Sequence, residues 1–433
     1  MSVTLIGIVL IIGLLILLSM GTPISFALGF LGTVGITIWL GVGNLYQIAE
    51  IAAESGTNLF MLTLPLFILM AEVVSFSGVG NDIYTAAHRW LSWLPGGLAI
   101  SSVATCTGFA AISGSSPATA ATVGLVAIPE MIKRGYNRKL AAGSIAVGGT
   151  LGILIPPSIT MIIYGIITEV SIGKLFIAGI IPGIVMSLML SVAIAVAVKL
   201  KPELAPRVEA VSWADRFSSL KRVWAFIALV LSILGTIYMG IATPTESAAI
   251  GAAFAIIIAA LYRRLSVGNL HMALRRTVAV TAMIMFLVIT GNVVAFLLSS
   301  LSIPQLVTES ITNMQLSKWS IMIVVNIILL IMGCLLDPMA IMVITLPIIF
   351  PIVTALGFDP VWFGIVVTVN VEIGMITPPV GLNLFILKGA VKEVDMGDII
   401  GGVLPFVLLM IIGLGVIMAF PGLATWLPGR MGF

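Results

Sequence analysis

Apolar residues dominate the chain from Val3 to Trp426 in a series of long stretches that short polar segments interrupt. Many of these stretches approach the roughly 20 residues that a helix needs to cross a bilayer. The pattern therefore predicts an all-α polytopic membrane protein. The first stretch lacks a basic segment and a small-residue cleavage motif, so we interpret it as a retained helix and not as a signal peptide.

The composition agrees with this interpretation. The 433 residues are 60% hydrophobic and 9% charged, whereas soluble domains are about half apolar and about a quarter charged. The net charge of +3 does not indicate a nucleic-acid partner, because the basic residues lie in short connections. Cys106 and Cys334 lie in apolar runs without metal-ligand spacing, which predicts core packing. His88 and His271 lie beside arginines in polar connections, where they are explained without ligation.

Basic residues gather in a few segments, which the positive-inside rule assigns to the cytoplasm. These residues are Lys133, Arg134, Arg138, Lys139, the run from Lys199 to Arg222, Arg263, Arg264, Arg275 and Arg276. The apolar segment from Trp93 to Lys133 begins and ends at such charge and carries SGSSP at its middle. This favours a re-entrant hairpin that enters from the cytoplasm with its tip at Ser113–Pro117. A full out-and-back pair of crossings is the alternative.

Prolines repeat along the chain at a nearly constant spacing of 221 to 223 residues. The matched pairs are Pro23 and Pro244, Pro117 and Pro338, Pro129 and Pro351, Pro156 and Pro378, and Pro182 and Pro405. Five landmarks in one order predict a duplication, with repeats at residues 1–200 and 222–433 and a cytoplasmic linker at 201–221. We expect hairpins at about 96–132 and 318–356, and broken helices at about 140–168 and 361–390.

The second hairpin lacks the basic residues that flank the first, so it is predicted to enter from the periplasmic side. The repeats are then inverted, an arrangement that in secondary transporters places substrate and ion sites near the membrane midplane. We count three crossings before the first hairpin and two after it, repeated in mirror image. Both termini are then periplasmic.

Paired prolines occur at Pro156–Pro157 and again at Pro378–Pro379. Proline removes an N–H donor and frees backbone carbonyls, which survive at membrane depth only where they line a cavity or are buried in protein. Freed carbonyls suit a cation such as Na⁺, and the N–H groups of the restarting helix suit an anion. A simple kink explains one such pair, but two matched pairs, each with a polar hairpin tip, favour binding sites.

Four acidic residues fall within apolar segments, where charge is costly and usually functional: Glu72, Glu246, Asp337 and Glu372. Asp337 occupies the tip position that Ser116 holds in the first repeat, which predicts either a cation ligand or a helix N-cap. Glu246 follows Pro244 in a first helical turn, where the helix dipole accounts for it. Glu372 precedes the second break without an acidic counterpart in the first repeat, and Glu72 has no assignment.

At these motifs the sequence resembles the large membrane subunit, of the DctM type, of tripartite ATP-independent periplasmic (TRAP) transporters. The resemblance runs nearly the whole chain and rests on GTPISFALG, LTLPLFILMAE, SGSSPATAATVG, LGILIPPSI, ATPTESAAIGA, GCLLDPMAIMVITLPIIFPI, GFDPVWFGIV and IGMITPPVGLNLFIL. It implies an elevator-type symporter of the ion transporter superfamily in the bacterial inner membrane. This symporter would move an organic acid anion with two or more Na⁺ ions. It also implies two partners: a small four-helix membrane subunit and a periplasmic substrate-binding protein.

The resemblance also implies site residues at the tips and breaks. The first Na⁺ site would use Ser113, Ser115, Ser116, Gly148, Gly152 and Pro156, and the second Gly333, Asp337, Asn370, Thr377 and Pro378. For the organic anion the candidates are Ser116, Pro117, Thr119, Pro157, Ser158, Pro379, Gly381 and Asn383. No arginine or lysine is expected at mid-membrane depth, so the anion would be held by helix N-termini, hydroxyls and bound cations. The matched motifs do not choose between C4-dicarboxylates, sialic acids and similar acids.

Three other functions compete with this one. A stand-alone Na⁺- or H⁺-coupled carrier of the same superfamily would work without a binding protein. A membrane enzyme would need a nucleophile–base pair, an aspartate dyad or a metal cluster, and a channel would need a filter built by oligomer symmetry. Two amphipathic stretches, residues 44–58 and 81–94, predict interfacial arms that brace a moving domain, or else ordinary connections.

Overall fold

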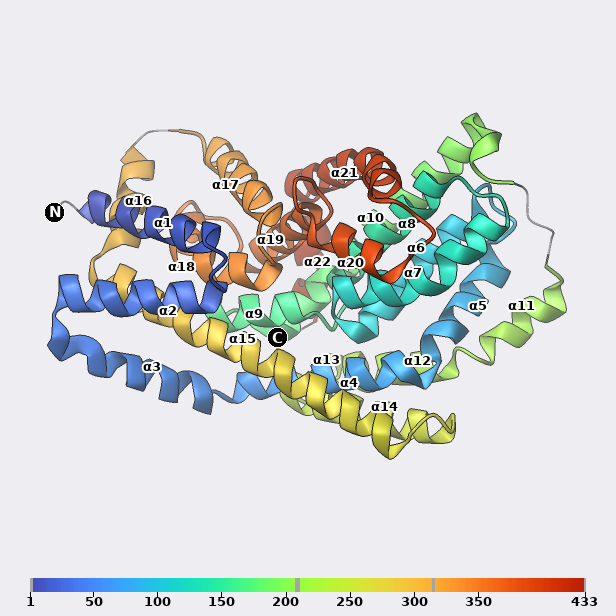
Figure 1. The fold of residues 1–433 in the computed structure, drawn as a ribbon, viewed down its shortest axis with the longest axis horizontal. Helices are drawn as coiled ribbons and strands as arrows, with labels where there is room; N and C mark the ends of the chain where they lie inside the picture. The colour runs from blue at the N-terminus through green and yellow to red at the C-terminus, as the bar shows by residue number, and fades with distance from the viewer. Residues whose placement is uncertain (1–2, 207–210, 314–315, 432–433) are drawn as a thin grey trace.

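The computed structural model describes residues 3–206, 211–313 and 316–431, and every regular element in these ranges is a helix (Figure 1). This confirms the all-α polytopic fold. Among the described residues, six helices are long and apolar enough to cross a membrane, or eight if each of two bent helix pairs counts as one crossing. The sequence predicted more crossings than this; α1, α2 and α19, which were counted toward them, are apolar but have fewer than 18 residues.

The first half of the chain contains eleven α-helices up to the linker. They are α1 (Val3–Ser19), α2 (Ile24–Gly35), α3 (Tyr46–Thr57), α4 (Thr63–Ser77), α5 (Val79–Leu91), α6 (Gly97–Ser113), α7 (Ser116–Lys133), α8 (Arg138–Leu151), α9 (Ile159–Thr168), α10 (Ile172–Leu200) and the linker helix α11 (Trp213–Leu220). The predicted first hairpin thus corresponds to α6 and α7, and the predicted first broken helix to α8 and α9.

The second half contains the remaining helices. They are α12 (Trp224–Val230), α13 (Thr236–Tyr238), α14 (Pro244–Leu261), α15 (Val267–Ser300), α16 (Ile303–Asn313), α17 (Lys318–Gly333), α18 (Pro338–Ala355), α19 (Pro360–Met375), α20 (Leu382–Ala390), α21 (Met396–Ala419) and α22 (Gly422–Arg430). Here α17 and α18 correspond to the predicted second hairpin, and α19 and α20 to the second broken helix.

One group of helices, which we call the scaffold group, consists of α2, α4, α14 and α15 packed side by side (Figure 1). Glycines allow this close packing, because a Cβ on Gly32 would lie only 2.7 Å from Val293 Cγ1 on α15. Small residues at such contacts are the usual means by which membrane helices approach closely. The salt bridge between Glu72 of α4 and Arg276 of α15, at 3.5 Å, also lies in this group.

A second group, which we call the core group, consists of α6–α10 and α17–α22. Within it α8 packs closely against α6, α7 and α21, and α17 packs against α19. The contact between α8 and α21 is made at backbone level, because Gly143 lies directly against Gly402. Cys106 is buried in this group as predicted, whereas Cys334 is only half-buried, and both thiols are free.

The predicted amphipathic arms are the helices α3 and α5. The linker helix α11 docks on α5, where Arg89 Nη1 donates to the Asp215 carbonyl oxygen at 3.0 Å and Trp90 Nε1 donates to the Arg216 carbonyl oxygen at 3.1 Å. In the second half, the segment that corresponds to α3 is not a separate helix. It forms the first part of α15, which runs unbroken for 34 residues. In the first half, Asn58 separates α3 from the turn that leads into α4.

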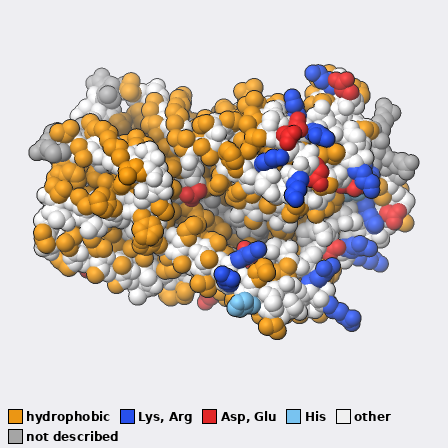
Figure 2. Space-filling model, viewed as in Figure 1, with side chains coloured by type: hydrophobic (Ala, Val, Ile, Leu, Met, Phe, Trp, Pro, Cys, Tyr) orange, Lys and Arg blue, Asp and Glu red, His pale blue; other side chains and the backbone are white. Residues whose placement is uncertain are grey.

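Charged and apolar side chains are segregated on the surface. Figure 2 shows Lys and Arg side chains gathered toward the right of the molecule, whereas hydrophobic side chains cover the left. Many large apolar residues are exposed, among them Ile11, Phe26 and Ile323. Exposed apolar surface of this extent is expected of a protein that lies in hydrocarbon.

Candidate functional site

The ends of both hairpins and both interrupted helices meet at one cavity of about 490 Å³, which we call the central cavity. The core group supplies most of its lining: Gly114, Ser115, Ser116, Pro117, Ile153, Ile159, Thr160, Gly333, Cys334, Leu335, Leu336, Asp337, Pro338, Met339, Met375, Val380 and Leu382. Ile24 of α2 and Met283 of α15 complete it from the scaffold group. The cavity therefore lies at the border between the two groups.

The first hairpin tip is a tight turn built from serines and one glycine. Gly114 has a φ of 60°, a conformation that favours glycine because it has no Cβ. Ser115 caps α7 by accepting a hydrogen bond from the Ala118 N–H at 3.4 Å. The Ser113 and Thr119 hydroxyls are hydrogen-bonded at 2.8 Å. The tip thus presents hydroxyl and carbonyl oxygens next to a helix N-terminus.

The second hairpin tip carries a charge in place of the serines. The Asp337 carboxylate caps α18, accepting hydrogen bonds from the N–H groups of Met339 at 3.0 Å and Ala340 at 3.2 Å. Asp337 therefore has the predicted N-cap role, and it also lines the cavity, where a cation could reach it. The first N–H groups of α18 are occupied by this carboxylate.

Each tip rests on the interrupted helix of its own half. The Ile159 N–H points at the Gly114 carbonyl oxygen at 3.5 Å, and the Gly381 N–H donates to the Cys334 carbonyl oxygen at 3.3 Å. These two contacts occupy matched places in the two halves.

The helices are interrupted at both paired prolines. After α8 ends, a short 3₁₀ turn at Gly152–Leu154 precedes α9, and the two parts are bent by 41°. The peptide bonds Pro156–Pro157 and Pro378–Pro379 are both cis. Between Met375 and Leu382 the chain likewise leaves the helix before α20 begins. The backbone polar groups freed by each interruption therefore lie beside a hairpin tip and not in lipid.

Glycines near the breaks bring helices into close contact. A Cβ on Gly148 would lie 3.2 Å from the Val103 Cα, and one on Gly152 would lie 3.0 Å from the Ala110 Cα, both on α6. In the second half Gly333 of α17 and Gly374 of α19 face each other in the same way. Helix packing therefore already explains why these positions are glycines.

The structure brings some of the predicted site residues to the central cavity and places others behind it. Those that line the cavity are Ser115, Ser116, Pro117, Gly333 and Asp337. Those that do not line it are Ser113, Thr119, Gly148, Gly152, Pro156, Pro157, Ser158, Asn370, Thr377, Pro378, Pro379, Gly381 and Asn383. Several of the latter have local roles: Ser158 caps α9, and the Thr377 hydroxyl donates to the Ile373 carbonyl oxygen at 2.6 Å.

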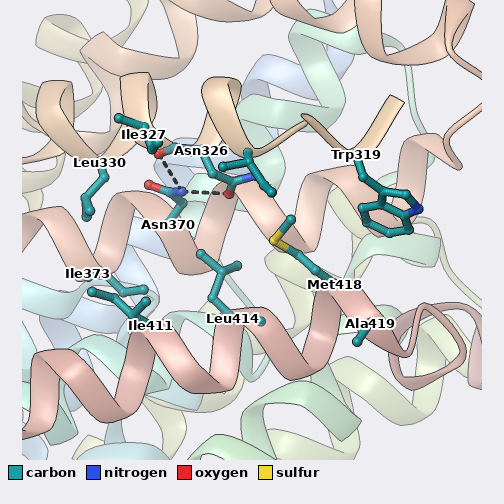
Figure 3. A pocket seen from close by; sticks show the side chains of 12 residues that line it. Trp319, Asn326, Ile327, Leu330, Asn370, Ile373, Ile411, Leu414, Met418 and Ala419 are labelled. Atoms are coloured by element: carbon teal, nitrogen blue, oxygen red, sulfur yellow. Dashed lines mark hydrogen bonds between the residues drawn. The ribbon is translucent and has the colours of Figure 1, made fainter. Parts of the chain in front are cut away.

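Asn370 lies at a different cavity, between α17, α19 and α21. Its Nδ2 donates to the Asn326 carbonyl oxygen at 3.0 Å and to Asn326 Oδ1 at 2.7 Å, as Figure 3 shows. This cavity of about 540 Å³ is otherwise apolar and includes Trp319 and Met418. The pairing with Asn326 has no sequence signal beyond two asparagines in apolar helices.

Two of the acidic candidates are explained by contacts away from the central cavity. Glu246 forms a capping box with Thr243, whose N–H and hydroxyl both donate to Glu246 Oε2 at 2.8 Å. Glu72 pairs with Arg276, a partner that sequence reasoning did not identify. These two residues are accounted for by helix capping and by packing of the scaffold group.

The third acidic candidate, Glu372, lies in the core group next to residues of the other half. Ser116 is its polar neighbour, and Ser116 Oγ accepts a hydrogen bond from Asn383 Nδ2. All three side chains are buried. Sequence reasoning named each of these residues but missed that they meet.

The central cavity has a distinctive charge distribution. Asp337 is the charged residue of its lining, and no Lys or Arg belongs to it. Among the described residues, no group of three or more His, Cys, Asp and Glu side chains could hold a metal ion. The geometry defines a membrane protein in which two hairpin tips and two interrupted helices line one cavity, and sites built on broken helices are typical of secondary transporters.

Comparison with known proteins identifies the family. The family model of the DctM component of tripartite ATP-independent periplasmic transporters matches residues 11–423. The chain therefore belongs to this family, and it is the large permease component of a binding-protein-dependent secondary transporter, a multi-pass protein of the inner membrane.

Individual relatives agree with this assignment. The C4-dicarboxylate TRAP transporter large permease protein DctM of Vibrio cholerae is 38% identical over 97% of this chain and 96% of that protein. The isethionate TRAP transporter permease protein DctMQ of Oleidesulfovibrio alaskensis is 33% identical over 95% of this chain and 65% of that protein. These homologues are named as permeases, which points to a role other than catalysis.

The fold also matches a solved structure. The YdaH transporter of Alcanivorax borkumensis superposes with a TM-score of 0.60 over 89% of this chain and 90% of that one, at 15% sequence identity. At this identity the match establishes the fold alone.

Proposed function

We propose that this permease takes up a small organic acid anion, delivered by a periplasmic binding protein, in symport with Na⁺ by an elevator movement. The observation that carries the proposal is the central cavity, where both tips and both interrupted helices converge without a basic side chain. An anion there needs positive charge from helix N-termini and from bound cations. The names of the relatives, C4-dicarboxylate and isethionate transporters, both denote small organic anions.

The two tips have unequal preferences for charge. At the second tip the Asp337 carboxylate already occupies the first N–H groups of α18, which favours a cation and opposes an anion. At the first tip Ser115 occupies only the Ala118 N–H with its neutral hydroxyl. We therefore place the anion against the start of α7.

We place one Na⁺ ion at each tip, on the side of its own interrupted helix. The first would be held by the Ser113 and Ser115 oxygens with carbonyls that precede Pro156. The second would be held by Asp337 with carbonyls of the chain around Thr377. Freed carbonyls and half-helix C-termini are the usual Na⁺ ligands in broken transporter helices.

Asp337→Asn separates the ion-binding role of this residue from its capping role. Asparagine caps helices about as well as aspartate, so the stability of the protein should change little. The Na⁺ concentration that gives half-maximal uptake should rise, because a ligand charge is lost. Ser113→Ala should act in the same direction. An unchanged Na⁺ dependence in both variants would remove these residues from the ion sites.

The elevator movement requires the core group to slide against the scaffold group. The border between them contains an apolar cavity of about 510 Å³ lined by α1, α2, α15, α16 and α18. Because this part of the border is apolar, the core group could slide along the scaffold group without breaking hydrogen bonds there. The basic residues gathered at one end of the molecule (Figure 2) support a cytoplasmic location of that end, by the positive-inside rule.

A disulfide across the border tests this movement. A Cβ on Gly291 of α15 would lie 3.3 Å from the Cβ of Val343 on α18, close to the roughly 3.8 Å of a disulfide. In a background without Cys106 and Cys334, the double variant Gly291→Cys/Val343→Cys should lose uptake on oxidation and regain it on reduction.

The matched control is Gly32→Cys/Val293→Cys, which joins α2 to α15 inside the scaffold group with Cβ atoms 3.5 Å apart. Oxidation of this pair should leave uptake unchanged. Full uptake by the oxidised Gly291/Val343 variant would contradict a sliding border.

Two partners complete the proposed transporter: a small membrane subunit and a periplasmic binding protein. The name DctMQ joins two components, and this chain spans 65% of that relative. The decisive experiment is reconstitution of the chain in vesicles with and without each partner, followed by uptake under an imposed Na⁺ gradient. Uptake that requires both partners and the gradient is expected. Uptake without the binding protein would instead support a stand-alone carrier.

A further inference from the structure

Ser116, Glu372 and Asn383 form a polar cluster in the packed interior of the core group. Ser116 begins α7, Glu372 lies in the last turn of α19, and Asn383 lies in the first turn of α20. Their exposed fractions are 0%, 1% and 0%. The cluster therefore joins the first hairpin tip to the interrupted helix of the opposite half.

This cluster contains more hydrogen-bond acceptors than donors. Asn383 Nδ2 donates to Ser116 Oγ, which leaves Asn383 Oδ1 free. In the described structure Asn383 Oδ1 has no hydrogen-bond partner, and the Glu372 carboxylate has the Ser116 hydroxyl as its one polar neighbour. A buried carboxylate with so little hydrogen bonding is strongly unfavourable, so a positive species is needed here.

The surrounding protein does not supply that positive charge. The polar neighbour of Glu372 is the Ser116 hydroxyl, which carries no charge. Lys388, on the same helix α20 as Asn383, donates to the Val394 carbonyl oxygen at 2.9 Å and pairs with Asp395 at 3.4 Å. No Lys, Arg or His of the described residues forms a salt bridge with Glu372.

We propose that Glu372, Asn383 and Ser116 bind a third Na⁺ ion, separate from the two placed at the tips. The proposal rests on the Na⁺ coupling put forward above. A carboxylate, an amide carbonyl and a hydroxyl are all oxygen ligands of the kind that hard cations take. A proton on Glu372 would add one hydrogen bond to the cluster, whereas a cation contacts the carboxylate, amide and hydroxyl oxygens at once; the experiment below distinguishes the two. One monovalent ion also balances one carboxylate.

The position of this ion gives it a role in transport. Ser115, Ser116 and Pro117 line the central cavity, while Glu372 and Asn383 lie behind them. A cation at the cluster would hold the first tip against the opposite half and place positive charge behind the wall where the anion binds. Na⁺ binding would thereby favour the arrangement in which the anion site is formed.

Thermal unfolding of the purified complex of the permease with its small subunit tests the site without transport. Midpoints would be compared in NaCl and in choline chloride at equal ionic strength. Glu372→Gln keeps the size of the side chain and removes its charge. Without Na⁺ this variant should be at least as stable as the native protein, because no uncompensated carboxylate remains. Its Na⁺-dependent rise in Tm should be smaller.

Two further variants serve as controls for this experiment. Glu372→Asp keeps the charge on a shorter side chain, so its Tm should still rise, but at higher Na⁺ concentration. Glu246→Gln is the matched control, because Glu246 is an exposed capping residue of α14 and its loss should leave the Na⁺ response at the native size.

The outcomes separate this site from the proposed function. A Glu372→Gln variant with the full Na⁺-dependent rise in Tm would overturn the third site, even if uptake by the native protein is driven by Na⁺. A stabilisation that acidification produces in the native protein and not in Glu372→Gln, with Na⁺ responses unchanged, would assign a proton instead and would also overturn it. If native uptake shows no Na⁺ dependence at all, the proposed function itself fails.

Discussion

Gly374→Ala is expected to open the contact between the second hairpin and the second interrupted helix. A Cβ on Gly374 would lie 2.5 Å from the Gly333 carbonyl carbon and 2.9 Å from its oxygen. Ordinary contact begins near 3.4 Å, so α17 must move by about 1 Å (3.4 − 2.5 = 0.9 Å) relative to α19. The obstructing atoms are backbone, and no side chain can rotate away.

The cost follows from two opposing effects. Alanine stabilises a helix interior by about 0.5–1 kcal/mol relative to glycine, whereas overpacking of a close contact costs about 1–3 kcal/mol. Since the obstruction is backbone, the upper part of that range applies and the net destabilisation should be about 1–2 kcal/mol. The shift also weakens the bond from the Gly381 N–H to the Cys334 carbonyl oxygen, which holds the second tip in place.

The assay is the thermal unfolding midpoint of the purified protein, measured together with uptake in vesicles. Gly415→Ala is the matched control, since a Cβ there would meet nothing within 4 Å and helix propensity alone should act. Gly374→Ala should lower the midpoint and reduce uptake, whereas Gly415→Ala should leave the midpoint unchanged or raise it. A midpoint for Gly374→Ala at or above the native value would refute the reasoning.

Two further predictions concern charged groups away from the central cavity. The pair Glu72–Arg276 is 3.5 Å long with side chains 25% and 60% exposed, so a double-mutant cycle on thermal stability should give a coupling of about 0–1 kcal/mol; a much larger coupling would contradict a partly solvated pair. Burial on α5, and next the nearby Arg134, lower the pKa of His88 from its usual 6.5, so the folded protein binds this proton less readily than the unfolded chain. The stability that His88 contributes is therefore fully present above about pH 6.5 and is lost as the pH falls through the folded pKa. The variant His88→Gln should therefore flatten the acid side of a profile of Tm against pH. An unchanged profile would refute this.

Local backbone chemistry explains why much of the site could be predicted from the sequence. Proline cannot continue a helix, so the interruptions around Pro156 and Pro378 could be read from the residues themselves. The same holds for the tips, where serine, aspartate and proline are the usual residues of a helix start. These signals act over a few residues and do not depend on the rest of the fold.

Contacts between distant segments could not be predicted in this way. Spacing matched Ser116 with Asp337, yet Ser116 bonds to Asn383, 267 residues away. Likewise the partners of Asn370 and Glu72 are Asn326 and Arg276, on helices whose pairing is set only when the bundle assembles. A single sequence does not indicate which helices pair in this way, because apolar helices of similar composition can pack in many ways.

The unbroken helix α15 has a mechanical consequence for the scaffold group. Its 34 residues form a rod of about 50 Å, so a tilt imposed at one end must appear at the other. The corresponding part of the first half is jointed at Asn58, where the side chain accepts a bond from the Phe60 N–H at 2.9 Å and a new helical turn begins. One side of the scaffold group can thus bend at Asn58, whereas the side formed by α15 stays straight. In the proposed movement, the core group would therefore slide along one flexible and one rigid surface.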